Sequence, residues 1–348
     1  MKKVQLLLLV VITGLLSSCA GIKYFTIETH EPAQVTLPTN IHSVLIVNNV
    51  VNQPEDIGHT LKKIGSKDYE RVTVNIDSTA IFYTEALSQF LNEENYFENV
   101  QLYNKPLRID NDFWEQKPIE PNTMNRMRKT TGADAIISLD KLIVQTNRED
   151  QFVQQNLIYG KLKANIYSII HVYLPSLDGK IPTIQFNDSL MWEGFDLQES
   201  FGMNEFILPS RENAIKELSI YAAEKMTYIF SPHWVMQDRW YYTLPNTPMR
   251  QGEVLAQDNK WLEAIQRWEF FFNTEKDKNK KAKAANNIAL AYEMIDDMDN
   301  AYKWIIISEE LFVQTTSQNS LDRKRTKIYK TEIKRRQDNS NKLDMQTK

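Results

Sequence analysis

The chain has 348 residues, of which 42% are hydrophobic, 11% aromatic and 25% charged. It is long enough for one large or two ordinary globular domains, and too aromatic for an intrinsically disordered protein. Its single cysteine excludes an internal disulfide and a zinc site with four cysteine ligands, and its formal net charge of −4 excludes a globally basic nucleic-acid-binding protein.

Residues 1–18 have the organisation of a signal peptide. Lys2 and Lys3 precede an uncharged and mostly aliphatic run at residues 4–16. This run is too short to cross about 30 Å of hydrocarbon, which takes roughly 20 helical residues. Its length is typical of the apolar core of an export signal.

The end of this run resembles the lipobox of bacterial lipoproteins, in which an aliphatic residue and two small residues precede a cysteine. The matching residues are Leu16, Ser17, Ser18 and Cys19. The resemblance implies cleavage before Cys19 and attachment of acyl chains, such as palmitate, to its sulfur and its new amino group. Two or more buried chains anchor a protein firmly, whereas one binds marginally. The alternatives are a secretory signal with an incidental cysteine, or an uncleaved anchor.

The mature chain would lose two lysines with the signal, which changes its net charge to −6. It would keep no free thiol, as suits an oxidising periplasm. Residues 19–42 contain Pro32 and Pro38 and few periodic apolar positions, which predicts a lipidated tether. No acidic run follows Cys19, and this favours attachment to the outer membrane on the side that faces the periplasm.

Residues 43–230 are predicted to form an α/β domain with a mixed sheet and a long β-hairpin. Its elements in chain order are a strand at 43–51, a helix after Ser78, a strand at 99–103, a helix at 122–131, a strand after Gly132, paired strands at 157–174 and 183–195, and a helix after Ser210. The clearest signal lies in 157–174, where the even positions are apolar and the odd positions are more polar. This alternation predicts a strand with one face in the core.

Three features of this region resemble known envelope proteins. The order of elements, the segment GADAIISL at 132–139 and the turn SLDGK at 176–180 resemble the compact α/β domain of TolB (its N-terminal domain), CsgG and LpoB. This resemblance covers about half of the chain. The segment EPAQVTLP and the later VLIVNN, both within 31–49, resemble an uncharacterised family of Gram-negative lipoproteins that carry a tetratricopeptide tail. That family implies no known activity.

Residues 231–250 are rich in proline and aromatic residues and are predicted to be a linker. In residues 251–336 helical periodicity takes over, and four positions recur 37 residues later, close to the tetratricopeptide period of about 34. These packing positions are Gly252, Leu255, Ala264 and Trp268, followed by Ala289, Tyr292, Ala301 and Ile305. We therefore predict an all-α domain of tetratricopeptide-like repeats with a capping helix, followed by a disordered tail at 337–348. The alternative is an unrelated pair of helical hairpins.

The sequence contains no motif for a nucleotide, a metal or a catalytic nucleophile. Its histidines are scattered along the chain, at His30, His42, His59, His171 and His233. We therefore expect no enzyme, no cofactor and no metal.

Two further features carry alternatives. Candidates for a glycan-binding aromatic platform are Trp114, Trp192, Trp234 and Trp240, although large aromatic side chains more often fill cores. The basic run at 323–336 is interpreted as a solvated helix face, with contact to anionic lipid headgroups as the alternative.

These observations predict a membrane-anchored envelope lipoprotein that acts as a non-enzymatic scaffold. Its helical repeats and its α/β domain would bind one or more envelope proteins, and no nucleic acid. The alternative is a lipoprotein that binds or processes glycans through its aromatic-rich loops.

Overall fold

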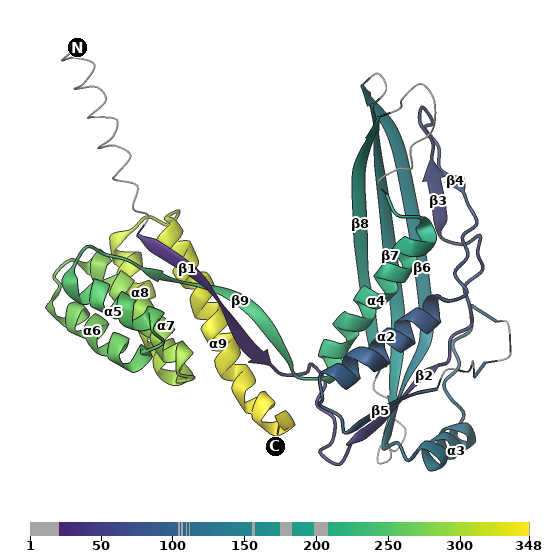
Figure 1. Cartoon of the computed structure of the whole chain (residues 1–348), viewed down its shortest axis with the longest axis horizontal. Coiled ribbons are helices and arrows are strands. Elements are labelled where there is room, and N and C mark those ends of the chain that lie inside the picture. Colours follow the sequence, from purple (N-terminus) through teal and green to yellow (C-terminus); the bar gives the residue numbers. More distant parts are fainter. Residues whose placement is uncertain are drawn as a thin grey trace. The chain divides into compact units, whose positions relative to one another are not determined.

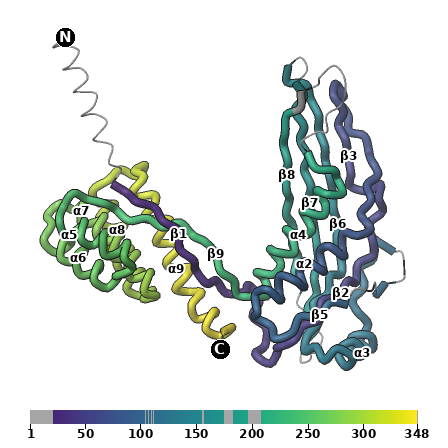
Figure 2. The backbone as a smooth tube through the Cα atoms, viewed as in Figure 1, coloured from purple at the N-terminus to yellow at the C-terminus, as the bar shows by residue number. Residues whose placement is uncertain are grey.

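The computed structural model describes residues 21–103, 105, 107–108, 110, 112–154, 157–174, 183–197 and 208–347. These residues form two compact units (Figures 1 and 2). One is an α/β unit at 33–233. The other is a helical unit that joins residues 21–32 to 234–347. The predicted order, a mixed-sheet domain followed by a region of several helices, is confirmed.

The α/β unit contains one seven-stranded mixed sheet. Its strands are β2 (Ser43–Asn48), β3 (His59–Lys62), β4 (Glu70–Arg71), β5 (Asn99–Tyr103), β6 (Ala135–Gln154), β7 (Leu157–Tyr173) and β8 (Thr183–Leu197). Strands β6, β7 and β8 form an antiparallel meander. Strand β2 pairs in parallel with β5 and with the first part of β6, and β3 pairs in parallel with a later part of β6.

Helices cover both faces of this sheet. Helices α2 (Thr79–Glu93) and α4 (Arg211–Phe230) pack on each other and on one face, where the largest hydrophobic core lies (Figure 1). The predicted alternation in β7 is confirmed, because every even position from 158 to 172 is buried, including the polar Ser168. Helix α3 (Pro121–Thr131) lies over a smaller core on the other face and ends at Gly132, whose φ of 73° favours glycine.

The helical unit consists of five helices and a two-stranded ribbon. The helices are α5 (Thr247–Gln257), α6 (Trp261–Thr274), α7 (Lys278–Met294), α8 (Met298–Thr315) and α9 (Leu321–Thr347), and the ribbon strands are β1 (Ile22–Glu31) and β9 (His233–Tyr242). Each helix packs on the next one along the chain. Among the described helices, none is both long and apolar enough to span a membrane.

Three predicted boundaries are wrong. The tether at 19–42 is not free chain, because 22–31 form β1 and Val35 N donates to Ile229 O inside the α/β unit. The linker at 231–250 contains β9 and the start of α5. The tail at 337–348 is not disordered up to Thr347, because α9 continues through it and its polar side chains bond to β1 and α8. The turn at 176–180 lies outside the described residues.

Candidate functional site: the helical unit and its ribbon

The β1–β9 ribbon lies across the helices of its unit. Gly21 O accepts from Thr243 N at 3.0 Å, and Thr26 Oγ1 donates to Asp238 Oδ1 at 2.9 Å, so the two strands run in opposite directions. Phe25 of β1 packs into the core of α5, α6 and α7, while Tyr241 of β9 packs among α7, α8 and α9. Figure 1 shows the ribbon crossing the helices.

A buried asparagine on α7 holds the backbone of β9. Asn287 Oδ1 accepts from Tyr242 N at 2.7 Å, and Asn287 Nδ2 donates to Tyr242 O at 2.8 Å. One side-chain amide thus pairs with both polar groups of a single residue, as a neighbouring strand would. The helices therefore bind an extended segment of their own chain.

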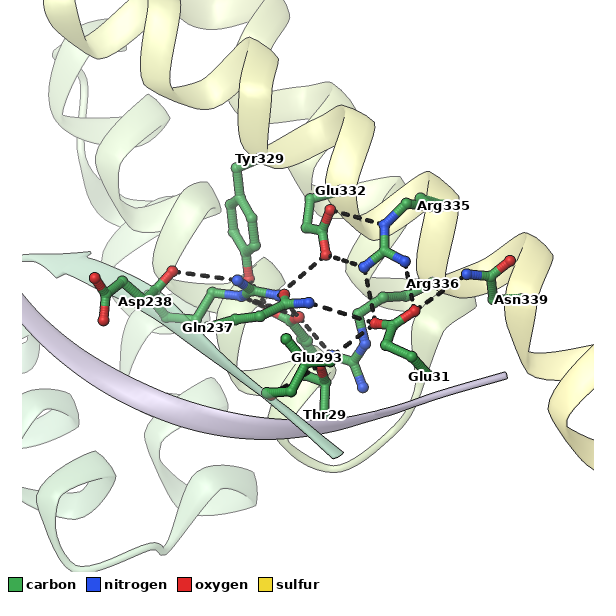
Figure 3. A network of polar contacts seen from close by, with 12 residues as sticks. Thr29, Glu31, Gln237, Asp238, Glu293, Tyr329, Glu332, Arg335, Arg336 and Asn339 are labelled. Atoms are coloured by element: carbon green, nitrogen blue, oxygen red, sulfur yellow. Dashed lines mark hydrogen bonds and ion pairs between the residues drawn. The ribbon is translucent and has the colours of Figure 1, made fainter. Parts of the chain in front are cut away.

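A buried ion pair fixes the middle of the ribbon (Figure 3). Arg239 of β9 donates to both carboxylate oxygens of Glu293 on α7, with Nε to Oε2 at 2.9 Å and Nη2 to Oε1 at 2.7 Å. Tyr329 and Arg336 of α9 donate to the same carboxylate. Burial would raise the pKa of the Glu293 carboxyl, but Arg239 and Arg336 outweigh it and hold that pKa below its ordinary value. The carboxylate is therefore ionised and joins β9, α7 and α9.

A second ion pair ties the end of β1 to α9. Glu31 accepts from Arg335 Nη2 at 2.8 Å and from Asn339 Nδ2 at 3.2 Å, and Arg335 also bonds to Glu332. The hydrogen bonds that Arg335 donates to Glu332 and Glu31 raise the pKa of its guanidinium group. Figure 3 shows these side chains converging from β1 and α9. The basic run is thus not uniformly solvated, because its C-terminal half forms ion pairs inside the unit.

A small pocket of about 80 Å³ lies next to Glu31. Its lining includes the acidic residues Asp296 and Asp344, and Asn339 supplies an amide. His30, also in the lining, stacks on Trp234 with ring centroids 4.7 Å apart, and Trp234 remains 63% exposed. Burial lowers the pKa of His30, so the ring stays neutral at pH 7. Hydrogen-bonding groups beside an exposed aromatic ring are a combination that can hold a polar ligand.

An open groove of about 500 Å³ lies at the first helix pair. It is lined by Arg250, Gln251 and Val254 of α5 and by Arg267 of α6. Val254 is 57% exposed. The groove thus combines apolar side chains with two arginines.

The eight predicted packing positions all lie on α5 to α8. Six of them are buried, and Leu255 and Tyr292 are half-buried. Gly252 allows the closest approach, because a Cβ there would lie 2.3 Å from Trp268 Nε1. Trp268 Nε1 itself donates to Met249 O at 3.3 Å. These positions pack helices together, and their tetratricopeptide identity stays a prediction.

Of the four candidate tryptophans, two fill cores and two are exposed. Trp192 packs on the main core of the α/β unit, and Trp240 lies against Tyr329 at 5.3 Å between ring centroids. Trp114 and Trp234 are exposed but belong to different units. The four rings therefore do not form one platform within either unit.

The α/β unit holds a separate buried polar cluster that the sequence did not indicate. Asp140 lies at a register shift in β6, between Leu139 and Lys141, and is 1% exposed. It accepts from Ser138 Oγ and from Asn49 Nδ2 (3.1 Å), while His171 Nδ1 lies 2.6 Å from its Oδ2. The serine hydroxyl therefore bonds to the carboxylate and not to the imidazole. This is not the arrangement of a serine nucleophile activated by histidine, and it orients His171 instead.

The histidines remain scattered in the fold. His59 is buried, and its Nδ1 lies 2.9 Å from Thr146 Oγ1. Burial and the charge of Arg211 lower the pKa of His59 to about 4. Within the described residues, no group of three or more His, Cys, Asp or Glu side chains is placed to hold a metal ion.

Two family models match this chain. Residues 41–242, more than half of the chain, match a domain of unknown function, DUF8603. The chain belongs to this family. Residues 250–335 match a second domain of unknown function, DUF6340. No curated protein matches the chain.

The border between the two matches falls at the end of the ribbon. The DUF8603 match ends at Tyr242, the last residue of β9, yet β9 packs on helices within the DUF6340 match. The Tyr242–Asn287 hydrogen bonds and the Arg239–Glu293 ion pair therefore connect residues of the DUF8603 match to residues of the DUF6340 match. The lipobox residues Leu16, Ser17, Ser18 and Cys19 lie outside the described residues.

Proposed function

We propose that this protein is a lipid-anchored scaffold of a Gram-negative cell envelope, attached through Cys19 and binding other envelope proteins through its helical unit. The observation that supports the scaffold role is the packing of the β1–β9 ribbon on the helices of that unit. Its helices already hold the β1–β9 ribbon through Asn287 and Glu293, so ribbon and helices form one packed unit. Binding surfaces are placed more precisely on packed helices and strands than on loops, so such a unit suits a binding platform.

The binding surface we assign to a partner is the open groove of the first helix pair. The β1–β9 ribbon already packs on the cores of α5 to α9, so we place the partner peptide on a surface that stays open. The groove is lined by Val254 together with Arg250 and Arg267. Such a surface fits an acidic amphipathic segment, whose apolar side chain contacts Val254 while its carboxylates pair with the arginines.

A site-specific photocrosslinker tests this assignment in native membranes. A crosslinking residue at Val254 should give a discrete adduct, and the double variant Arg250→Glu, Arg267→Glu should lose it. The matched control places the crosslinker at Met345, which is equally exposed on α9. Equal adducts at Val254 and Met345, or an adduct that survives the double variant, would contradict the assignment.

The pocket beside Glu31 supports a second candidate, glycan binding. Trp234 offers an exposed ring, and the pocket supplies carboxylates and an amide from Asp296, Asp344 and Asn339. Sugars bind by stacking on aromatic rings and by such hydrogen bonds. Titration of the full chain with envelope oligosaccharides should quench tryptophan fluorescence if this is correct. The Trp234→Ala variant should bind more weakly, and Trp114→Ala, the control, should not.

A further inference from the structure

The lipid anchor would be attached close to one defined end of the helical unit. Gly21 O accepts from Thr243 N at 3.0 Å, so the ribbon is already paired at its first described residue. Cys19 precedes Gly21 by two residues. Two residues span at most about 7 Å, so an acyl anchor on Cys19 would be tethered within that reach of Gly21.

The first turns of α7 and α9 lie at the same end. Tyr242, which precedes Thr243, lies between them. Its ring centroid is 5.6 Å from Lys283 Nζ of α7, and its hydroxyl donates to Asp322 Oδ1 of α9 at 3.2 Å. Phe312 near the end of α8 also contacts the ring, at 5.9 Å between centroids. We call the segments 275–283 and 313–327 the anchor end.

The anchor end is strongly basic, although the whole chain is acidic. Its cations are Lys276, Lys278, Lys280, Lys281, Lys283, Arg323, Lys324, Arg325 and Lys327, against the acids Glu275, Asp277 and Asp322. Of these cations, Lys276, Lys278, Lys324 and Lys327 have exposed side chains. The basic run on α9 is thus divided. Its C-terminal part pairs with Glu31, Glu293 and Glu309, while its first four cations lie at the anchor end.

Exposed apolar side chains accompany these charges. Leu321, the first residue of α9, is 65% exposed, and Val313 near the end of α8 is 46% exposed. Lysine and arginine around an exposed aliphatic residue are typical of surfaces that lie in the headgroup region of a bilayer.

We propose that the anchor end is a docking surface for an anionic phospholipid bilayer. The proposal rests on the lipidation of Cys19, which would hold the anchor end against the leaflet that carries the acyl chains. The lysines and arginines would then contact lipid phosphates, and Leu321 would insert among the headgroups. Each basic residue near an anionic surface changes the ratio of docked to undocked protein about fivefold.

Fluorescent labels on the lipid-modified full chain test this orientation in vesicles. Acylation consumes the native thiol, so a single new cysteine takes the label. Gln318→Cys places it in the exposed loop between α8 and α9, within the anchor end. Asp258→Cys is the control, at the far end of α5, whose 11 residues span about 16 Å. Vesicles contain phosphatidylcholine with or without phosphatidylglycerol, and a spin-labelled lipid quenches labels at the surface.

We expect the Gln318 label to be quenched more when phosphatidylglycerol is present, and added salt to reverse the effect. The Asp258 label should not respond. The variant Lys278→Glu, Lys324→Glu, Lys327→Glu should abolish the response, whereas the control variant Arg126→Glu, Lys129→Glu, Lys216→Glu changes exposed cations of the α/β unit and should keep it.

Two failures are distinguishable in the same samples. Cys19 without acyl chains would overturn both the lipoprotein proposal and this inference. An acylated Cys19, with a Gln318 label that is indifferent to phosphatidylglycerol or to the triple variant, would overturn this inference alone.

Discussion

Gly252 gives the sharpest test of how the first helix pair packs. In the middle of a helix, replacing glycine by alanine ordinarily stabilises a protein by about 1 kcal/mol. At Gly252 the new methyl group would lie 2.3 Å from Trp268 Nε1 and 2.7 Å from two other atoms of the ring. Trp268 is fully buried, so the ring cannot move away without disturbing its neighbours.

The opposing terms decide the sign of the change. Overpacking a core costs roughly 1–3 kcal/mol, and a displaced ring also loses the hydrogen bond from Trp268 Nε1 to Met249 O, worth about 1 kcal/mol. Together these exceed the propensity gain. We therefore expect Gly252→Ala to lower the free energy of unfolding of the helical unit by about 1–3 kcal/mol.

Urea denaturation of the full chain, with hydrogen exchange read on α5 and α6, measures this effect. Gln251→Ala changes the neighbouring exposed position and should stay within about 0.5 kcal/mol of wild type. In a Trp268→Leu background the ring is gone, so Gly252→Ala should become neutral or stabilising. A stabilising Gly252→Ala in the native background, or an equal cost in both backgrounds, would refute the reasoning.

Three further predictions concern the ribbon and the buried charges. Asn287→Ala leaves the Tyr242 N–H and C=O without their partner, so it should lower the free energy of unfolding by about 2–4 kcal/mol. Hydrogen exchange at the Tyr242 amide should also become faster, and unchanged exchange would contradict the role of Asn287 in holding β9. Glu293→Gln should cost about 3–5 kcal/mol at pH 7, because two arginines lose their carboxylate. The folded pKa of Glu293 lies below 4.5, so the stabilisation from its carboxylate is present above pH 4.5 and is lost as the pH falls through that folded pKa. The free energies of unfolding of wild type and variant should therefore converge in acid. A constant difference down to low pH would be inconsistent with this. His59 has a folded pKa of about 4 against an ordinary 6.5, so the α/β unit should lose stability as the pH falls from 6.5 towards 4, and urea titrations of a His59→Asn variant should lack that loss between pH 6.5 and 5.

The sequence predicts the elements whose buried face is apolar. Strand β7 alternates in polarity, and α4 carries a continuous apolar stripe that the structure buries. It does not predict β1, because two of its buried positions are polar, Thr29 and Glu31. Arg335 and Asn339, which bond to Glu31, lie more than 300 residues along the chain, on α9, so no local pattern signals them.

Long-range polar contacts also explain why the sequence does not predict the end of α9 or the Asp140 cluster. Residues 337–347 are almost entirely polar, and only tertiary contacts such as Gln337 with Asp299 show why they stay helical. Asp140 lies in the buried first part of β6, and apart from Ser138 its partners come from β7 and from the residue after β2. Polar groups that satisfy each other over long distances leave no periodic signal in the sequence.

Our central proposal is that this chain is held in a membrane through Cys19, two residues before Gly21, where the ribbon pairing begins. Mass spectrometry of the N-terminal tryptic peptide of the native protein tests it most directly. We predict a peptide from Cys19 to Lys23 that carries acyl chains on the cysteine sulfur and on the amino terminus. An unmodified Cys19 within a peptide that continues from Ser18 would contradict the claim.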